Sequence, residues 1–462
     1  MPPLDLYQSF DVNKLERVFY NENLFVRTGQ FFTTNTDFTK KFENQSKISF
    51  TAIYEYSILG GPLQNKNTDE LNDIVLLKER SNEISPLSAW RLQVDYSFPL
   101  SENVNLEAGY QYRTVHHTGE FDFERLNISS NTWQSDPEFA DTLDLRQTIH
   151  AGYLQLNGKF KQLKYRAGLR AEQMYRTLTH VLSVAPIKLN QLDFFPSLQL
   201  LWELKNGQEL RGGYSKRIDR PTTKALSPFK NHRHSEAIWI GDPNLRPQIS
   251  DNLEVTYRKN YEKGSLSLTV YNNYTTNLIF RTNESYSRIT LLTLLTNAGN
   301  SNSTGMEFVS DWQIAKWMRI YFSGNTYYFK IIDIKNAEVN KANSCNYNLN
   351  GNLSFRIHPK FKIQCDANYI SRTVTAKGDD TDLLISNIRL KYMLNTKWSF
   401  DLLFQNIFNS NIQTITTKNI SFYSSIEYSK FDRIFQMSMS YRFNDHDRNN
   451  KTIKTEYGEK DF

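Results

Sequence analysis

The sequence predicts an all-β fold, and three observations carry that prediction. Apolar and polar residues alternate with a period of two along most of the 462 residues, as they do in half-exposed strands. Aromatic residues make up 14% of the chain, which argues against intrinsic disorder. The mean hydropathy is −0.58, and the chain has no run of about 18 apolar residues, so membrane-spanning helices are excluded.

The strands are predicted in order along the chain. The first clear one covers 47–56, where Ile48, Phe50 and Tyr54 share one face. Later alternating segments lie at residues 91–98, 104–113, 163–172, 198–204, 253–257, 266–270, 353–357, 363–369, 388–392 and 433–443. Because polar turn residues bound the segments, neighbours are expected to pair as antiparallel hairpins.

The connections alternate between short and long. Short polar turns are predicted near residues 43–44, 101–103, 161–162, 205–207, 262–264, 315–316, 359–360, 394–396 and 429–430. Longer polar stretches are predicted at 60–85, 119–143, 180–191, 219–249, 282–298, 334–343, 375–381 and 410–416. An outer-membrane barrel has short periplasmic turns and long extracellular loops, whereas a soluble sandwich has no reason for this asymmetry. We therefore predict a transmembrane antiparallel β-barrel of about 18 strands.

The two faces of one segment fit a barrel better than a soluble core. Its charged side chains at every second position are Lys164, Arg166, Arg170 and Glu172, and its apolar ones are Leu163, Tyr165 and Leu169. The charged face is predicted to line a polar lumen and the apolar face to meet lipid. Aromatic residues expected to form the girdles at the two membrane surfaces are Phe42, Phe98, Tyr110, Tyr112, Phe160, Trp202, Tyr257, Trp317, Trp398 and Phe443.

The sequence divides into three parts. Residues 1–26 have no assignment, 27–444 form the predicted barrel, and 445–462 are a charged tail expected to be mobile and periplasmic. The segment from Arg433 to Phe443 resembles the terminal strand that barrel-insertion machinery recognises. The first residues carry no basic stretch, apolar stretch or cleavage site of a signal peptide, so no export signal is expected in the sequence as given.

One stretch resembles a known family. Its motifs are FPS at 195–197, SKRIDRP at 215–221, LSPF at 226–229 and GDPNLRP at 241–247. They resemble the C-terminal barrel of TonB-dependent outer-membrane receptors, in particular the outer-membrane β-barrel family of Bacteroidota. Asp242 stands where the family usually has Asn, and Gln248 stands where it usually has Glu. The resemblance covers residues 27–444, and the prolines of the motifs are expected to fix the base of a rigid loop.

The resemblance implies a Gram-negative transporter that takes up a scarce large nutrient: a siderophore, haem, vitamin, glycan or peptide. Its complete members have barrels of about 22 strands, so the resemblance implies an incomplete 22-stranded barrel as the alternative to a closed one of 18. They also have a signal peptide, a plug domain and a TonB-contacting box, none of which the sequence shows. The TonB system is therefore an expected partner only if a plug lies upstream. The alternatives are a plugless porin-like channel or a structural outer-membrane protein, and, third, a soluble all-β binding protein.

Other expected partners are outer-membrane lipid, the insertion machinery and the nutrient. Nucleic acid is not expected, since the net charge is only +6. No cofactor and no enzymatic activity are predicted, because the chain has no Gly-x-Ser-x-Gly elbow and no Gly-rich phosphate loop. The two cysteines, Cys345 and Cys365, fall on one predicted hairpin, which leaves a disulfide open as the less favoured alternative.

Candidate ligand-contacting residues come from the long loops, where aromatic and basic side chains suit rings, sugars and anionic chelates. They are Trp133, Arg220, His232, His234, Trp239 and Arg246. Three patterns contain residue types that bind metals: the spacing of His232 and His234, the pair His116–His117, and the acidic run at 379–382. None forms a complete ligand set, so no metal is predicted.

Overall fold

The structure is a computed structural model, and it describes residues 4–11, 14–69, 74–181, 183–234, 237–286, 290–297, 299–332, 343–375, 378–418, 423–429 and 433–443. Within these residues, twenty strands form one large sheet and two smaller sheets have four strands each. No helix in the described part is long and apolar enough to cross a membrane. The predicted all-β antiparallel fold is confirmed, whereas the tail 445–462 lies outside the described residues.

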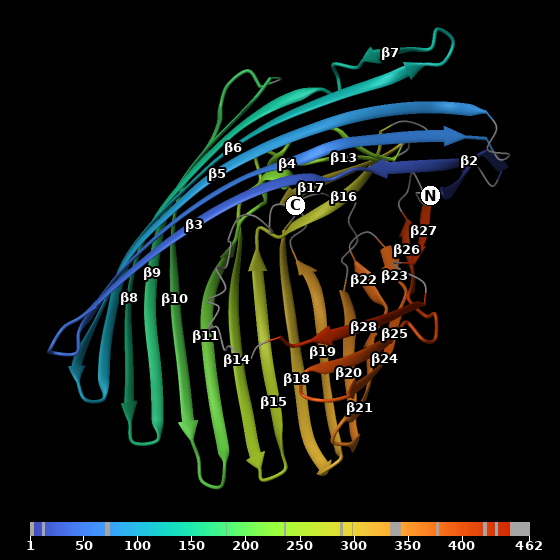
Figure 1. The fold of residues 1–462 in the computed structure, drawn as a ribbon. Coiled ribbons are helices and arrows are strands. Elements are labelled where there is room, and N and C mark those ends of the chain that lie inside the picture. Colours follow the sequence, from blue (N-terminus) through green and yellow to red (C-terminus); the bar gives the residue numbers. More distant parts are fainter. Residues whose placement is uncertain are drawn as a thin grey trace.

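The large sheet is a curved wall of antiparallel hairpins (Figure 1). Its long strands are β3 (Thr28–Lys41), β4 (Lys47–Thr68), β5 (Val75–Ser101), β6 (Val104–Asn127), β8 (Asp141–Phe160), β9 (Leu163–His180), β10 (Ile187–Glu203), β11 (Gln208–Asp219), β14 (Gln248–Tyr261), β15 (Gly264–Thr276), β18 (Asn300–Ala315), β19 (Met318–Ile332), β20 (Asn343–His358), β21 (Phe361–Ile370), β24 (Leu383–Met393), β25 (Trp398–Gln405) and β28 (Ile434–Tyr441). Shorter strands extend the wall at its loop end: β1 (Leu4–Asp11), β2 (Lys14–Phe25) and β7 (Thr132–Ser135).

The smaller sheets lie in the long connections. One contains β12 (Asn231–His234), β13 (Ala237–Ile240), β16 (Ile279–Ser285) and β17 (Leu291–Asn297). The other contains β22 (Thr373–Thr375), β23 (Gly378–Asp380), β26 (Ile412–Lys418) and β27 (Tyr423–Ser429). A single turn of helix, α1 (Thr223–Leu226), precedes β12.

Eight of the nine predicted short turns join neighbouring wall strands at one end of the sheet. The ninth, near 429–430, is wrong as a wall turn. Ser429 ends β27, which pairs with β26, while β28 pairs with β25. The prediction failed because the strands of the sheet β22-β23-β26-β27 show the same alternation as the strands of a wall hairpin. Residue 430 itself lies outside the described residues.

Two predicted loops, 60–85 and 119–143, are mostly strand, because β4, β5 and β6 are 22, 27 and 24 residues long. Spanning a bilayer takes about 9–11 tilted residues. These strands therefore continue far beyond the membrane, where the outer face meets water and the inner face is covered by other parts of the chain. The period-2 alternation of apolar and polar residues fades there. We call β4, β5, β6, β8 and β9 the tall wall, and β20, β21, β24, β25 and β28 the low wall.

The outer face of the tall wall changes from apolar to polar along its strands. Near the short turns, outward side chains such as Leu92 and Val94 are exposed, as expected against lipid. A row of aromatic rings follows, in which His150 lies 5.3 Å from Tyr112 and 6.3 Å from Tyr175 between ring centroids. Past this row, the outward side chains include the ion pairs of His116 with Asp144 and of Arg80 with Glu124. The row therefore marks the upper limit of the membrane-spanning segments.

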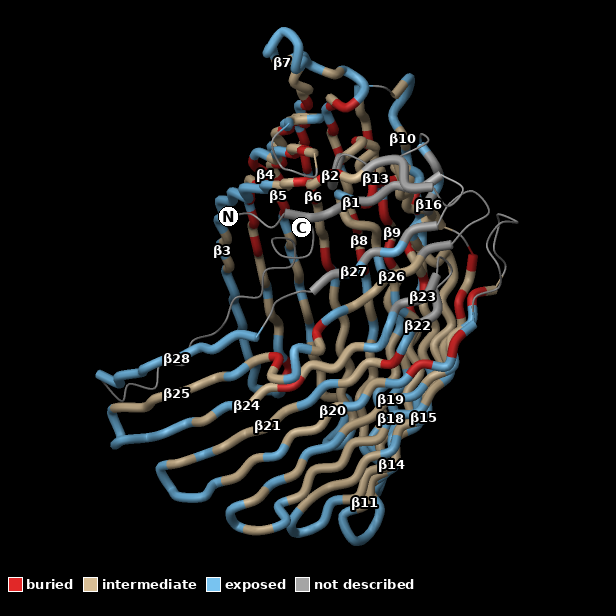
Figure 2. Tube along the Cα trace, turned by 90° about the vertical axis from the view of Figure 1, so that its right-hand side faces the viewer, coloured by how far each residue is buried: buried red, intermediate tan, exposed pale blue. Residues whose placement is uncertain are grey.

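The inner face is polar, as predicted for β9. Glu172 is only 4% exposed, whereas Leu169 on the opposite face is 50% exposed. Buried residues concentrate on the upper part of the tall wall and are sparse on the low wall (Figure 2).

The wall does not close on itself within the described residues. Its outer strands, β3 and β28, each pair with a single neighbour there, β4 and β25 respectively. The closed 18-stranded barrel is thus not observed. Cys345 and Cys365 are free, so the disulfide alternative is wrong. Cys365 is paired with Leu353, eight residues along β20 from Cys345, or about 26 Å at the strand rise.

Candidate functional site: the capped mouth of the tall wall

The inner face of the tall wall, above the membrane level, is covered by a folded cap. We define the cap as residues 220–247 together with the sheet β12-β13-β17-β16. Wall and cap share one hydrophobic core, whose buried members are Phe121, Phe123, Phe139, Leu143, Leu145, Leu178, Ala225, Leu226, Phe229, Ile238 and Leu245. Without this cap the upper inner face would expose apolar side chains to water, which costs about 25 cal/mol per Å².

The motifs singled out in the sequence build the cap's backbone. Thr222 caps α1, its hydroxyl accepting a hydrogen bond from the backbone N–H of Ala225 at 3.1 Å. The chain then returns so that the N–H of Gly241 donates to the carbonyl of Ser227 at 2.9 Å. A Cβ at position 241 would lie 2.5 Å from that same oxygen, so only glycine fits. This close return explains the spacing between LSPF and GDPNLRP.

Asp242, which stands where the family usually has Asn, stabilises the turn that begins the end of the motif. Its carboxylate accepts a hydrogen bond from the backbone N–H of Asn244 at 2.8 Å, an Asx turn that Asn forms equally well. The following carbonyls bind the wall. Arg176 of β9 donates to the carbonyl of Leu245 at 2.7 Å and to that of Pro243 at 3.2 Å. The turn and the buried Arg176 together fix the end of the motif against the wall.

A buried charge cluster fixes the beginning of the cap. The carboxylate of Glu172 on β9 accepts hydrogen bonds from the guanidinium groups of Arg170 (2.6 Å) and Arg220. Arg113 of β6 lies 3.6 Å from the same carboxylate. Arg220 follows β11 directly, so this contact holds the chain on the inner wall just after β11 ends at Asp219. Hydrogen bonds between a guanidinium group and a carboxylate are stronger than hydrogen bonds between neutral groups.

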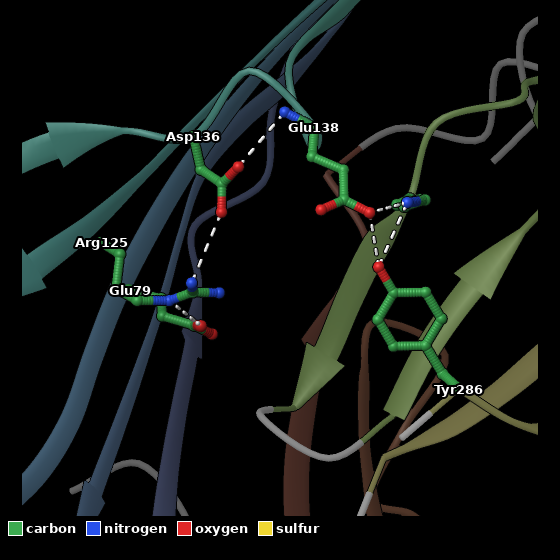
Figure 3. A network of polar contacts seen from close by, with 6 residues as sticks. Glu79, Arg125, Asp136, Glu138 and Tyr286 are labelled. Carbon is green, nitrogen blue, oxygen red and sulfur yellow. Dashed lines mark hydrogen bonds and ion pairs between the residues drawn. The ribbon is translucent and has the colours of Figure 1, made fainter.

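A second polar network joins the wall, the loop before β8 and the cap (Figure 3). Arg125 of β6 donates to the buried Glu79 at 3.1 Å and to Asp136 at 3.4 Å. The carboxylate of Asp136 accepts the backbone N–H of Glu138 at 3.2 Å. Glu138 then pairs with Lys230 of the cap and accepts the hydroxyl of Tyr286 at 2.5 Å.

The ammonium of Lys230 and then the hydroxyl of Tyr286 lower the pKa of Glu138 from its usual value. Glu138 therefore stays charged in mildly acidic medium. The whole network lies above the aromatic row, outside the membrane-spanning segments.

The predicted ligand residues are distributed around this cap, and four of them have described side chains. Trp133 lies on β7 at the tip of the tall wall, with the guanidinium of Arg80 4.3 Å from its ring centroid. Trp239 lies on β13, with Lys224 Nζ 5.6 Å from its ring centroid. Arg246 is exposed, while its backbone is held by Asn297 at 2.7 Å.

Arg220 is placed differently from expectation, because its charge is paired inside the protein. His232 and His234 lie on β12, and their side chains are outside the described residues. Sequence reasoning missed Glu172 and Arg176 as cap anchors. The sequence contained a signal for Glu172, which is a carboxylate among basic residues on a predicted lumen face. Nothing in the sequence indicated that Arg220 would be its partner.

Metal ligation finds no support among the described side chains. They contain no group of three or more His, Cys, Asp or Glu that could hold an ion. His116 is instead paired with Asp144 at 3.2 Å on the outer face. The acidic residues Asp379 and Asp380 lie on β23, with side chains outside the described set.

Comparison with known proteins agrees with the wall and its motifs. The profile of the family described as "Outer membrane protein beta-barrel family" matches residues 40–441. A comparison with curated proteins gives no match.

Solved structures with a similar fold include the copper transporter OprC (TM-score 0.66, 10% identity) and the ferric citrate transporter FecA (0.64, 12%). A third is the ferripyoverdine receptor of the outer membrane of Pseudomonas aeruginosa (0.60, 13%). Each likeness covers 92% of this chain but only 66%, 62% and 56% of the respective structure. The chain thus spans about two thirds or less of their length.

Proposed function

The chain belongs to the outer membrane protein β-barrel family, and on that premise we propose that it forms the wall and mouth of an energised outer-membrane receptor. The receptor takes up a scarce nutrient too large for a diffusion pore. Its structural neighbours are TonB-dependent receptors, and the likeness concerns the fold.

The observation that carries the proposal is the cap. A passive pore works with an open lumen, whereas here a segment that shares a hydrophobic core with the wall is fixed on the inner wall at the mouth. Two polar networks hold it, one through Glu172 and one through Lys230. A mouth ordered in this way suits selective capture of a solute, because binding groups on a rigid base lose little conformational freedom.

The proposed nutrient class rests on the side chains of the mouth and on the solved structures with a similar fold. The neighbouring structures are a copper transporter, a ferric citrate transporter and a ferripyoverdine receptor. For this chain we propose a metal chelate first, and haem, a vitamin, a glycan or a peptide as the other classes. Trp133, Trp239 and Arg246, with His232 and His234, are the proposed contacts, and Arg220 acts on the ligand only through the Glu172 pair.

A plug and the TonB system are proposed partners of the complete receptor. The porin-like alternative needs a closed wall around an open lumen. Within the described residues β3 and β28 each have one neighbour, which favours the receptor over a pore formed by this wall alone.

The test is uptake in cells that produce the protein from its own locus. Labelled ferric chelates, haem, cobalamin, oligosaccharides and peptides are offered with and without a protonophore. Uptake of one class that the protonophore abolishes is expected. Uptake that is insensitive to the protonophore would establish the porin-like alternative, and uptake no greater than in a deletion strain would refute transport of these classes.

A matched pair of variants then locates the contacts. Trp133→Ala and Arg246→Ala are expected to lower uptake at limiting concentration. Trp398→Ala, at the short-turn end of the low wall, is the control and should leave it unchanged. Equal effects of all three would mean that the variants act through stability.

A further inference from the structure

A small pocket lies between the cap and the tall wall, apart from the two polar networks. Its volume is about 100 Å³. The lining residues come from β4, β5, β6 and β8 on the wall side and from residues 223–239 on the cap side. The uptake contacts proposed above share only Trp239 with it.

The floor of the pocket is apolar and uncharged. Leu87, Phe121, Leu143 and Phe229 are all buried there. His117 also lines it. Burial lowers the pKa of His117 to about 4, so its imidazole is neutral in neutral medium. Its ring donates to the backbone carbonyl of Pro86, since proline has no N–H to offer, and so adds no charge to the floor.

The rim of the pocket carries charges of both signs. Glu83 is on the wall side, where its carboxylate accepts the hydroxyl of Ser85 at 2.9 Å. Lys224 is on the cap side, beside the ring of Trp239, and Arg27 lies near the top of β3. A carboxylate oriented by a hydroxyl can bind an ammonium group, and the ammonium and guanidinium groups can bind a carboxylate.

The pocket is open to solvent on one side, so its volume limits the enclosed apolar part of a bound molecule, whereas the molecule's polar groups can lie at the charged opening. A buried apolar cavity of about 150 Å³ holds a benzene ring. At about 100 Å³ this pocket suits a branched aliphatic group of three or four carbons rather than a ring. The combination of an apolar floor with an anionic and a cationic rim fits a small zwitterion that carries an apolar side chain.

We propose that this pocket binds a free α-amino acid with a branched aliphatic side chain. The side chain lies among Leu87, Phe121, Leu143 and Phe229. The ammonium group faces Glu83, and the carboxylate faces Lys224 and Arg27. Because the pocket lies between cap and wall, a bound amino acid contacts both and stabilises their contact, whichever nutrient the receptor imports.

The test is calorimetric titration of the detergent-solubilised protein with L-leucine. Leucinamide, which lacks the carboxylate, and N-acetyl-leucine, which lacks the ammonium, serve as matched probes. Saturable binding of leucine is expected, with each analogue at least about tenfold weaker, since each loses a charge-assisted contact. Leucinamide binding as tightly as leucine would overturn the proposal in favour of a peptide N-terminus. Absence of leucine binding would overturn the site altogether.

Variants separate the pocket from the rest of the cap. Glu83→Gln and Lys224→Met are expected to weaken leucine binding about tenfold, and Leu87→Trp should abolish it by filling the floor. Asp401→Asn, which removes a charge from the low wall far from the cap, is the control and should leave the affinity unchanged. If a variant does not fold, as judged by heat-modifiable gel mobility, the probe series on the unaltered protein still decides.

Discussion

The tall wall and the low wall are built from the same hairpins, yet they differ in height and in what they bury. The tall-wall strands are 18 to 27 residues long, while those of the low wall are 8 to 16. The tall wall contributes Phe121, Leu143 and Leu178 to a hydrophobic core. Among the described low-wall residues the buried side chains are polar: Ser344, Asn346 and Ser386.

The difference teaches how a barrel wall can extend beyond the membrane. Inside the bilayer, lipid covers the outer face and the polar lumen accepts the inner one. Above the bilayer, an inner face with apolar residues needs protein to cover it. The tall wall has the cap, whereas the low wall has shorter strands, and its long connections form the second small sheet. The side of the sheet with the longer strands is therefore also the side that carries the cap, and the mouth is asymmetric.

The largest expected effect separates the two walls at the charge cluster. Glu172→Ala leaves three guanidinium groups without their shared carboxylate and is expected to destabilise the contact between cap and tall wall by about 3–5 kcal/mol. Limited proteolysis should then cleave within 220–247, while the low-wall hairpins stay resistant. The control is Asp401→Ala, which removes an exposed low-wall partner of Arg389. Similar protease sensitivity in both variants would contradict a special role for the cluster.

The core gives a somewhat smaller effect. Leu226→Ala removes a fully buried cap side chain and is expected to cost about 2–5 kcal/mol in cap stability. Hydrogen exchange of the cap amides measures the loss directly. The matched low-wall change is Leu402→Ala, expected to leave cap exchange unaltered. Unchanged cap exchange in Leu226→Ala would show that the core does not hold the cap.

Acid is expected to loosen the tall wall but not the low wall. The pKa of His117 is lowered by burial from 6.5 to about 4, so the unfolded chain binds the proton more readily than the folded one. The stabilisation is complete above about pH 6.5, declines as pH falls, and is lost below about pH 4, by about 3 kcal/mol at most. Cap exchange measured from pH 7 to 4 should show this dependence, and His117→Phe should flatten it. An unchanged slope in that variant would assign the effect to other groups.

The smallest effect is expected at the exposed pair between Glu138 and Lys230. The side chain of Glu138 is largely exposed, so the pair is screened and Glu138→Gln should cost less than about 1 kcal/mol. The loss should shrink further at high salt. Thermal unfolding at low and high ionic strength checks both points. A loss as large as that of Glu172→Ala would mean that the outer network, not the buried one, anchors the cap.

The features that could be predicted from sequence are the local ones. Period-2 alternation places Leu169 outside and Glu172 inside without knowledge of their neighbours, and short polar turns locate the hairpins. The pair of Glu172 with Arg220 spans 48 residues, and no local pattern reports such a contact. The extensions of the strands above the membrane could not be predicted from the sequence for a different reason. There both faces are polar or covered by the cap, so β5 loses the alternation that marks its lower half.

The shared core of cap and wall also sets an order of assembly. Each wall hairpin joins neighbours in sequence, so its contacts close short loops and can form early. The cap core instead brings Phe121 together with Leu245, and Leu292 and Leu295 pack against it. Contacts of such long sequence separation form slowly, because loop-closure entropy is lost before they stabilise anything. We therefore expect the mouth to fold last, when the wall is already in the membrane and still lacks its cap.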